Sequence, residues 1–229
     1  MLLVAHRAPA DATRCTVLRD AGADVFEVDL QAIGDEVVVS HFLPVVPLLP
    51  RLRHDRWAFR WGSAGAGAER LSVAAQRIPA GSEILLDLKD DTGQRGPALA
   101  ALILRSDLDP ARCYVSSRQW AVLPVLRQAG FRTWRTVWES RGLARVLDGP
   151  PTTDDAVTVR HGLLRGDVIH QLRHRAGRVI TWTVNSPARA AWLAASGVDG
   201  VTSDRVEVFA TLRADPPPAA ALTPAAQST

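Results

Sequence analysis

The stretch VITWTVNSPARAAWLAASGVDGVTSD, residues 179–204, holds one complete unit of the pattern that decides the fold. The apolar run at its start predicts a β-strand. Ser186 followed by Pro187 is typical of the first turn of a helix, and Gly197 is typical of a helix end. A second apolar run closes the stretch and predicts the next strand. This order of elements indicates two parallel strands joined by a crossover helix.

The same unit recurs along the chain. We interpret a short apolar run at 36–41 as an extension of the second strand, and the remaining runs predict eight strands, at 2–6, 24–30, 83–89, 112–116, 132–137, 156–161, 179–185 and 200–204. Helical patterns lie between several of them, at 11–21, 97–104, 120–128, 163–175 and 186–197. Eight strand–helix units in 229 residues predict an α/β protein, a (β/α)8 TIM barrel, as a single domain over residues 1–213.

Two segments depart from this pattern. Residues 42–80 hold several prolines and tryptophans and a Gly/Ala-rich turn, which predicts a long loop after the second strand with one helix near 68–76. Such loops lie over the mouth of a barrel and often carry function. Residues 214–229 are rich in Pro and Ala, which predicts a disordered tail.

The composition narrows the class of protein. The formal net charge is +3, and no basic run interleaved with aromatic residues suggests a nucleic-acid partner. No segment approaches the roughly 18 apolar residues that span a bilayer, so we expect no stable membrane insertion. The opening residues lack the features of a signal peptide, and the two cysteines have no ligand-like spacing. We therefore expect a cytoplasmic protein; its oligomeric state is not indicated.

Two carboxylates interrupt the second apolar run. Because strand side chains alternate between faces, Glu27 and Asp29 share one face, while their apolar neighbours occupy the other. Two like charges that lie side by side repel each other, and burying either without a partner is costly. The pattern therefore predicts a positive group between them.

Catalytic groups in a TIM barrel come from the C-terminal ends of its strands. Asp87 stands there on the third strand, so with Glu27 and Asp29 it predicts a hard oxygen-ligand set for Mg²⁺, Ca²⁺ or Mn²⁺. His6 and His41 have the chemistry of an acid/base pair near neutral pH. The remaining candidates, which we expect to hold a phosphate or line the pocket, are Arg7, Lys89 (the only lysine in the chain) and Trp182.

Each of these residues also has a purely structural interpretation. Glu27 and Asp29 would then be barrel-interior residues paired with an arginine such as Arg7 or Arg160. Asp87 and Lys89 would pair with each other, and His6 would be a hydrogen-bonded core residue. We favour the functional interpretation because the polar residues recur at the ends of several strands.

The motifs at these positions resemble, in order, those of the glycerophosphodiester phosphodiesterase family. They are HRA at 6–8, EVD at 27–29, VVSH at 38–41, DLK at 87–89, WTVN at 182–185 and GVDGVTSD at 197–204. The resemblance implies a metal-dependent barrel that cleaves a phosphodiester next to a glycerol hydroxyl, giving glycerol 3-phosphate and an alcohol. It also implies that His6 and His41 are the general acid and base, and that Glu27, Asp29 and Asp87 hold the metal.

The chain departs from the family pattern at several points. Ala8 replaces a glycine, Phe42 replaces an aspartate, and Asp87 replaces a glutamate. A Pro-Glu-Asn-Thr segment is missing, and residues 42–80 replace a smaller insertion that helps to bind glycerol. These departures concern the identity of the substrate more than the type of reaction.

The sequence leaves three functions open. The first is hydrolysis of a small glycerophosphodiester, either through a cyclic phosphate or by direct attack of water. The second is the same chemistry on a lysophospholipid, which the apolar run LPVVPLLP at 43–50 suggests. The third is a catalytically silent barrel that binds phosphorylated ligands.

Overall fold

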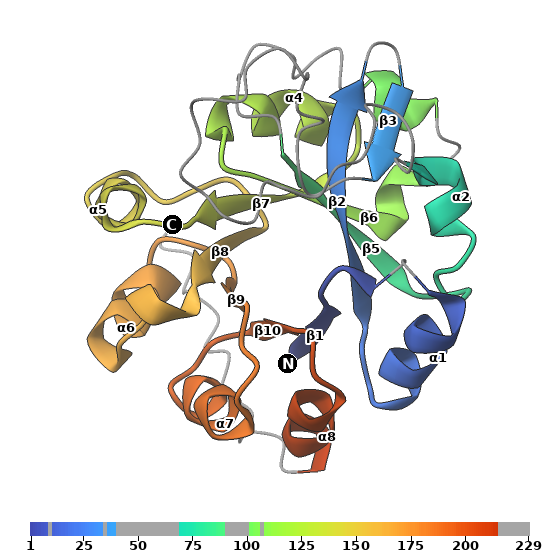
Figure 1. Ribbon diagram of the computed structural model, residues 1–229. Coiled ribbons are helices and arrows are strands. Elements are labelled where there is room, and N and C mark those ends of the chain that lie inside the picture. Colours follow the sequence, from blue (N-terminus) through green and yellow to red (C-terminus); the bar gives the residue numbers. More distant parts are fainter. Residues whose placement is uncertain (9–10, 34–35, 40–68, 90–100, 106–107, 215–229) are drawn as a thin grey trace, which may run out of the picture.

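The computed structural model describes residues 1–8, 11–33, 36–39, 69–89, 101–105 and 108–214. Eight parallel strands of this part of the chain close into a barrel (Figure 1). They are β1 (Leu2–Ala5), β2 (Val25–Ile33), β5 (Glu83–Leu88), β6 (Cys113–Ser117), β7 (Arg132–Val137), β8 (Ala156–Arg160), β9 (Val179–Trp182) and β10 (Gly200–Ser203). The barrel closes because β1 pairs with β10 on one side and with β2 on the other. The predicted TIM barrel is confirmed.

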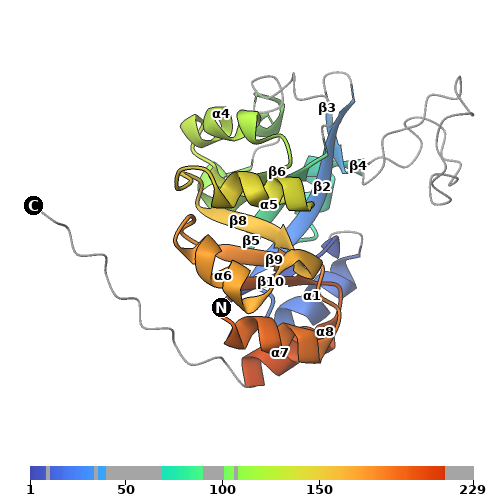
Figure 2. The same cartoon turned by 90° about the vertical axis from the view of Figure 1, so that its left-hand side faces the viewer.

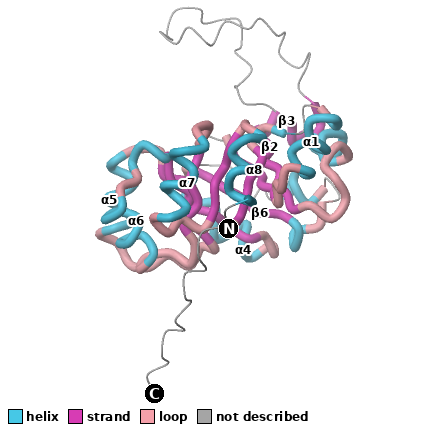
Figure 3. The backbone as a smooth tube through the Cα atoms, turned by 90° about the horizontal axis from the view of Figure 1, so that it is seen from below, coloured by secondary structure: helices cyan, strands magenta, loops and turns pink. Residues whose placement is uncertain are grey.

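Helices lie outside the ring of strands, which Figure 1 shows end-on, and they flank the strands in the side view of Figure 3. They are α1 (Ala12–Asp20), α2 (Leu71–Ala75), α4 (Leu123–Gln128), α5 (Ser140–Leu147), α6 (Gly166–Arg173), α7 (Pro187–Ala195) and α8 (Val206–Ala214), and residues 101–104 are also helical. Figure 2 shows α5 to α8 stacked along one side of the barrel. In the described part of the chain, no helix has the length and apolar character needed to cross a bilayer.

The helix ends follow the signals in the sequence. The Ser186 side chain accepts a hydrogen bond from the backbone N–H of Arg189, and Pro187 begins α7. Gly22 and Gly197, which follow α1 and α7, have φ angles of 103° and 95°. Glycine enters this left-handed region without steric cost, so it ends a helix cleanly. Two helices, α5 and α8, were not among the predicted ones.

The interpretation of residues 36–41 as an extension of the second strand is wrong. The chain reverses after Ile33, and β3 (Glu36–Val39) returns antiparallel along β2, with Leu30 opposite Val39. A short strand, β4 (Glu69–Arg70), pairs with the far edge of β3. This arrangement forms because β2 is longer than the barrel wall: its pairing with β5 ends at Leu30, and β3 satisfies the backbone groups beyond.

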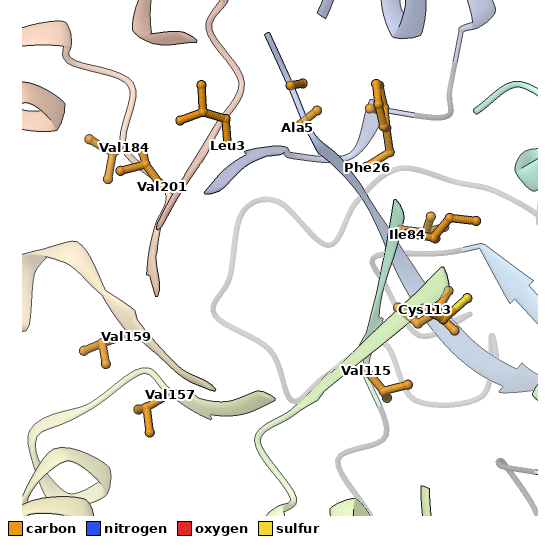
Figure 4. Packing of buried hydrophobic residues seen from close by; sticks show 14 of the residues in the cluster. Leu3, Ala5, Phe26, Ile84, Cys113, Val115, Val157, Val159, Val184 and Val201 are labelled. Carbon is orange, nitrogen blue, oxygen red and sulfur yellow. The ribbon is translucent and has the colours of Figure 1, made fainter. Parts of the chain in front are cut away.

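Alternating side chains divide each barrel strand into an outer and an inner face. Outward residues such as Phe26, Ile84 and Val157 point away from the middle of the barrel and belong to the large core beneath the helices (Figure 4). The inner apolar residues form a second, smaller cluster: Val4, Val25, Leu85, Tyr114, Trp134, Ala156 and Ile180. Along β2 the inward positions continue from Val25 to Glu27 and Asp29. The barrel interior is thus apolar near the N-terminal ends of the strands and acidic toward their C-terminal ends.

A buried carboxylate fastens the loop before β8 to the neighbouring strand. Asp154 is 5% exposed and accepts hydrogen bonds from Thr133 Oγ1 at 2.9 Å and from Thr152 Oγ1 at 2.8 Å. The Arg135 guanidinium binds Oδ2 of Asp154, with Nε at 3.0 Å and one terminal nitrogen at 2.9 Å. Removing a partner from such a buried, hydrogen-bonded ion pair leaves the other charge uncompensated.

We predict that Asp154→Asn lowers the free energy of unfolding by about 2 kcal/mol, because the partly buried Arg135 guanidinium loses its charged partner. Urea unfolding followed by circular dichroism measures this difference. Asp148→Asn removes an exposed carboxylate after α5 and serves as the control, with a change of at most about 0.5 kcal/mol. Equal effects of the two substitutions would contradict the structural role of Asp154.

Candidate active site

Polar side chains from the strands and the loops that follow them surround one cavity that is partly open to solvent. Its lining includes His6, Arg7, Glu27, Leu85, Asp87, Lys89, Ser116, Arg118, Thr136, Thr158, Trp182, Thr183 and Thr202. Residues from every barrel strand, or from the positions just after it, therefore face the same space.

The three predicted carboxylates come together at this cavity. Asp29 of β2 lies directly opposite Asp87 of β5 in the strand register, and Glu27 is two residues earlier on the same face. One oxygen from each carboxylate lies within 4.8 Å of the other two. Glu27 and Asp29 are buried, with 3% and 4% exposure. The structure thus brings together the acidic set that the sequence predicted, and its oxygen donors suit a hard divalent cation.

Positive groups partly neutralise this set. Lys89 Nζ lies 2.8 Å from Asp29 Oδ1 and also forms an ion pair with Asp87 Oδ2. Arg7 Nε lies 3.1 Å from the second Asp29 oxygen, Oδ2. The Ser116 hydroxyl donates a hydrogen bond of 2.6 Å to Asp87 Oδ1. The ion pairs proposed as the structural alternative therefore exist, and they lie inside the candidate site.

The acidic set shifts the pKa values of its members. Burial, followed by the charges of Asp29 and Asp87, raises the pKa of the Glu27 carboxyl well above its usual range. Burial alone would lower the pKa of the Lys89 ammonium, but the carboxylates of Asp87, Asp29 and Glu27 outweigh it and raise that pKa. Lys89 is therefore charged at neutral pH. Negative charge remains in excess around Glu27, as expected of residues that would hold a cation.

His6 is held between two carboxylates. Its Nδ1 lies 2.7 Å from Asp204 Oδ1, and its Nε2 lies 4.0 Å from Glu27 Oε2. Asn185 donates from Nδ2 to the other Asp204 oxygen at 2.8 Å, and Asn185 Oδ1 accepts from the backbone N–H of Asp204 at 3.0 Å. The hydrogen bond with His6 is the main reason that the pKa of Asp204 falls to about 2. Asp204 is thus ionised at neutral pH, so the proton between the two side chains resides on His6 Nδ1.

The backbone at Arg7 also contributes to the site. Its N–H donates a hydrogen bond of 2.7 Å to Glu27 Oε2, and its φ angle of 49° lies in the left-handed region. A non-glycine residue held there is strained, and such strain is common at functional sites. Ala8 is fully buried, and the left-handed angle belongs to Arg7. The replacement of glycine by Ala8 is therefore compatible with the backbone found here.

Trp182 lines the cavity at the end of β9, as predicted for a residue of the pocket wall. Its Nε1 is buried, and no residue in the described part of the chain accepts a hydrogen bond from it. His41 and the apolar run at 43–50 lie outside the described residues. The role of His41 as the second acid/base residue therefore stays a prediction.

Three further residues contribute to the site beyond the predicted catalytic, metal-binding and phosphate-binding set. Asp204 follows β10 and holds His6, Ser116 of β6 holds Asp87, and Arg118 follows β6 and lines the cavity. The position of Asp204 was predictable from the sequence, because the last strand of a closed barrel lies beside the first. The C-terminal end of that last strand is therefore next to His6. Ser116 lies opposite Asp87 in the β5–β6 register, which adjacent parallel strands also imply.

Comparison with solved structures shows the same fold. A glycerophosphodiester phosphodiesterase from Thermotoga maritima is 18% identical over 93% of this chain and 98% of that chain, with a TM-score of 0.68. A phosphodiesterase from Oleispira antarctica, in complex with the product sn-glycerol-3-phosphate, is 16% identical over 93% and 97%, with a TM-score of 0.69. A glycerophosphodiester phosphodiesterase from Parabacteroides distasonis is 18% identical over 93% and 98%, with a TM-score of 0.67.

No curated protein sequence matches the chain. The family model of the glycerophosphoryl diester phosphodiesterase family matches residues 89–208, which is just over half of the chain. The matched region begins at Lys89 and includes Trp182, which lines the cavity, Asp204, which contacts His6, and Asn185, which holds Asp204. With its barrel, its acidic set and its histidine in one site, the chain belongs to the glycerophosphoryl diester phosphodiesterase family.

Proposed function

We propose that this protein is a metal-dependent phosphoric diester hydrolase that cleaves glycerophosphodiesters to glycerol 3-phosphate and an alcohol. The observation that carries the proposal is the meeting of three carboxylates, His6 and Lys89 at one cavity. Family membership supports the reaction, and the related Oleispira antarctica structure contains sn-glycerol-3-phosphate, the corresponding product.

Glu27, Asp29 and Asp87 are the residues that would hold a divalent cation such as Mg²⁺, Ca²⁺ or Mn²⁺. The donor set supports this assignment, since three carboxylates meet in a largely buried space, where burial and then the charges of Asp29 and Asp87 raise the pKa of Glu27. A divalent cation bound there supplies Lewis acidity toward a phosphoryl oxygen and a hydroxyl. The Lys89 ammonium and the Arg7 guanidinium would bind the charged oxygens on phosphorus.

His6 has the orientation of a general base. With its proton on Nδ1 held by Asp204, the neutral imidazole presents Nε2 as a proton acceptor toward the side of Glu27. Nε2 would take the proton of the attacking hydroxyl, from either the substrate glycerol or water, and later return it. Asp204 is a positioning residue, because it fixes the tautomer and stabilises the charge that His6 acquires. The second proton-transfer residue remains His41 in this proposal.

We predict that His6→Ala and Glu27→Gln each lower kcat/KM for glycerophosphodiesters by about 10²- to 10⁴-fold, since each removes a group used in the reaction. Release of glycerol 3-phosphate from glycerophosphoglycerol and glycerophosphoethanolamine, with Mg²⁺, Ca²⁺ or Mn²⁺, measures the loss. His170→Ala and Glu207→Gln are the controls, because both side chains are exposed on helices, and they should retain wild-type activity. Folded wild-type protein that binds glycerol 3-phosphate but turns over no diester with any metal would support the binding-only barrel instead.

Cation binding itself has a readout that does not depend on turnover. We predict that Mg²⁺, Ca²⁺ or Mn²⁺ at about 100 times its dissociation constant stabilises the wild type by about 2.7 kcal/mol through mass action. Thermal unfolding with and without each cation measures this stabilisation. Asp29→Asn should abolish it, whereas Glu207→Gln should leave it intact. An unfolding temperature that none of the cations changes would contradict the proposed metal site.

The lowered pKa of Asp204 leads to a prediction of how the stability of the fold depends on pH. Because its pKa in the folded protein, about 2, is below the ordinary value of 3.8, Asp204 stabilises the fold above about pH 4 and loses this contribution as the pH falls toward 2. Asp204→Asn should therefore be less stable than wild type from pH 4 to 7, and the difference should shrink below pH 4. Urea unfolding across this range measures it. A difference that grows as the pH falls would contradict the assignment.

A further inference from the structure

An arginine that the proposed chemistry does not use stands on the rim of the cavity. Arg118 directly follows the last residue of β6 and is exposed, yet it lines the same cavity as His6, Asp87 and Lys89. The Ser117 side chain accepts a hydrogen bond of 3.0 Å from the backbone N–H of Gln119. The chain on both sides of Arg118 is therefore fixed relative to the barrel.

A tryptophan from the next strand supports the Arg118 side chain. The guanidinium carbon lies 4.8 Å from the centre of the Trp138 ring, and Trp138 directly follows the last residue of β7. Trp138 is 44% exposed, which is unusual for so large an aromatic side chain. A cation–π contact of this kind holds the guanidinium in place while leaving its N–H donors able to bind an anion.

No carboxylate in the described part of the chain forms an ion pair with the Arg118 guanidinium. Among the described residues, the inner cations Lys89 and Arg7 have Asp29 and Asp87 as partners, but no acidic side chain forms an ion pair with Arg118. Glu139, which follows Trp138, is exposed and makes no ion pair with Arg118 either. An arginine positioned at a ligand cavity without an acidic partner is suited to bind an anionic group of a ligand.

We propose, resting on the function proposed above, that Arg118 and Trp138 select glycerophosphodiesters whose alcohol carries an additional anionic group, a carboxylate or a phosphate. The scissile phosphate belongs near Lys89 and Arg7, beside the acidic set. Arg118 stands at the exposed edge of the same cavity, where the part of the substrate beyond that phosphate would lie. Its guanidinium would donate paired hydrogen bonds to the carboxylate or phosphate oxygens.

The same geometry disfavours a cationic alcohol. The Trp138 ring by itself would be a stacking surface for a quaternary ammonium group such as choline. Here one face of that ring already carries the Arg118 guanidinium, and its positive charge repels a second cation. A preference for glycerophosphocholine would therefore contradict the proposal.

Two pairs of substrates isolate the additional charge. Glycerophosphoserine differs from glycerophosphoethanolamine by one carboxylate, and glycerophosphoinositol 4-phosphate differs from glycerophosphoinositol by one phosphate. We expect wild-type kcat/KM to be about tenfold higher for the member with the additional anionic group in at least one pair, which is the size expected of charge-assisted hydrogen bonding by an exposed guanidinium. The pair that shows the preference identifies whether the carboxylate or the phosphate is recognised.

Variants of Arg118 and Trp138 test whether these two residues cause the preference. Arg118→Gln should lower kcat/KM about tenfold for the preferred diester with the additional anionic group, mainly through KM, and by no more than about twofold for its counterpart without that group. Arg118→Lys keeps the charge and should retain part of the preference, and Trp138→Ala should weaken it. Arg141→Gln, which removes an exposed arginine from α5 near Trp138, is the matched control and should preserve the preference.

The outcomes separate this proposal from the one on which it rests. Wild-type protein that cleaves none of the diesters overturns the proposed function, and the selectivity with it. Cleavage with no preference in either pair, or equal losses on all diesters in Arg118→Gln, overturns the selectivity alone. Loss of the preference in both Arg118→Gln and Arg141→Gln would also overturn it, because the effect would then come from general surface charge.

Discussion

The active site depends on the closure of the barrel by its first strand. β1 has four residues, and it pairs with β10 along one edge and with β2 along the other. Its position places His6 between Glu27, which belongs to β2, and Asp204, which follows β10. It also places the Arg7 backbone within hydrogen-bonding distance of Glu27. Without this closure, the acidic set would lie beside an open sheet edge, and the imidazole would have neither of its carboxylate neighbours.

The three carboxylates of the site place more negative charge in the protein interior than the neighbouring cationic side chains neutralise. Three carboxylates share two cationic side chains, and burial makes the mutual repulsion felt most at Glu27, whose pKa rises. Such an arrangement opposes folding, so the rest of the barrel must offset it. Two apolar layers do so, one under the helices and one inside the barrel beneath the acidic set. The inward face of one strand, β2, shows this compromise, because the apolar Val25 is followed there by Glu27 and Asp29.

The features that were predictable from the sequence follow from local periodicity. Alternation along 25–30 placed Glu27 and Asp29 on one face, and the order of strands placed Asp87 beside them. The hairpin of β2 and β3 was missed because an apolar run reads the same whether it continues a strand or returns along it. The helix α5 was missed because Gly142 lies inside it, where glycine is unfavourable. The contact between Arg118 and Trp138 depends on two loop side chains meeting in space, and no periodicity encodes such a meeting.

The contact between His6 and Asp204 joins residues 198 positions apart. The amino-terminal part of a chain leaves the ribosome first, so β1 and β2 exist long before the last strand is made. A nascent chain that contains Glu27, Asp29 and Asp87 already has every residue of the acidic set. It lacks the carboxylate that orients the imidazole until β10 joins β1. The proposed cation ligands are therefore complete in the growing chain before the carboxylate that holds the proposed general base has been made.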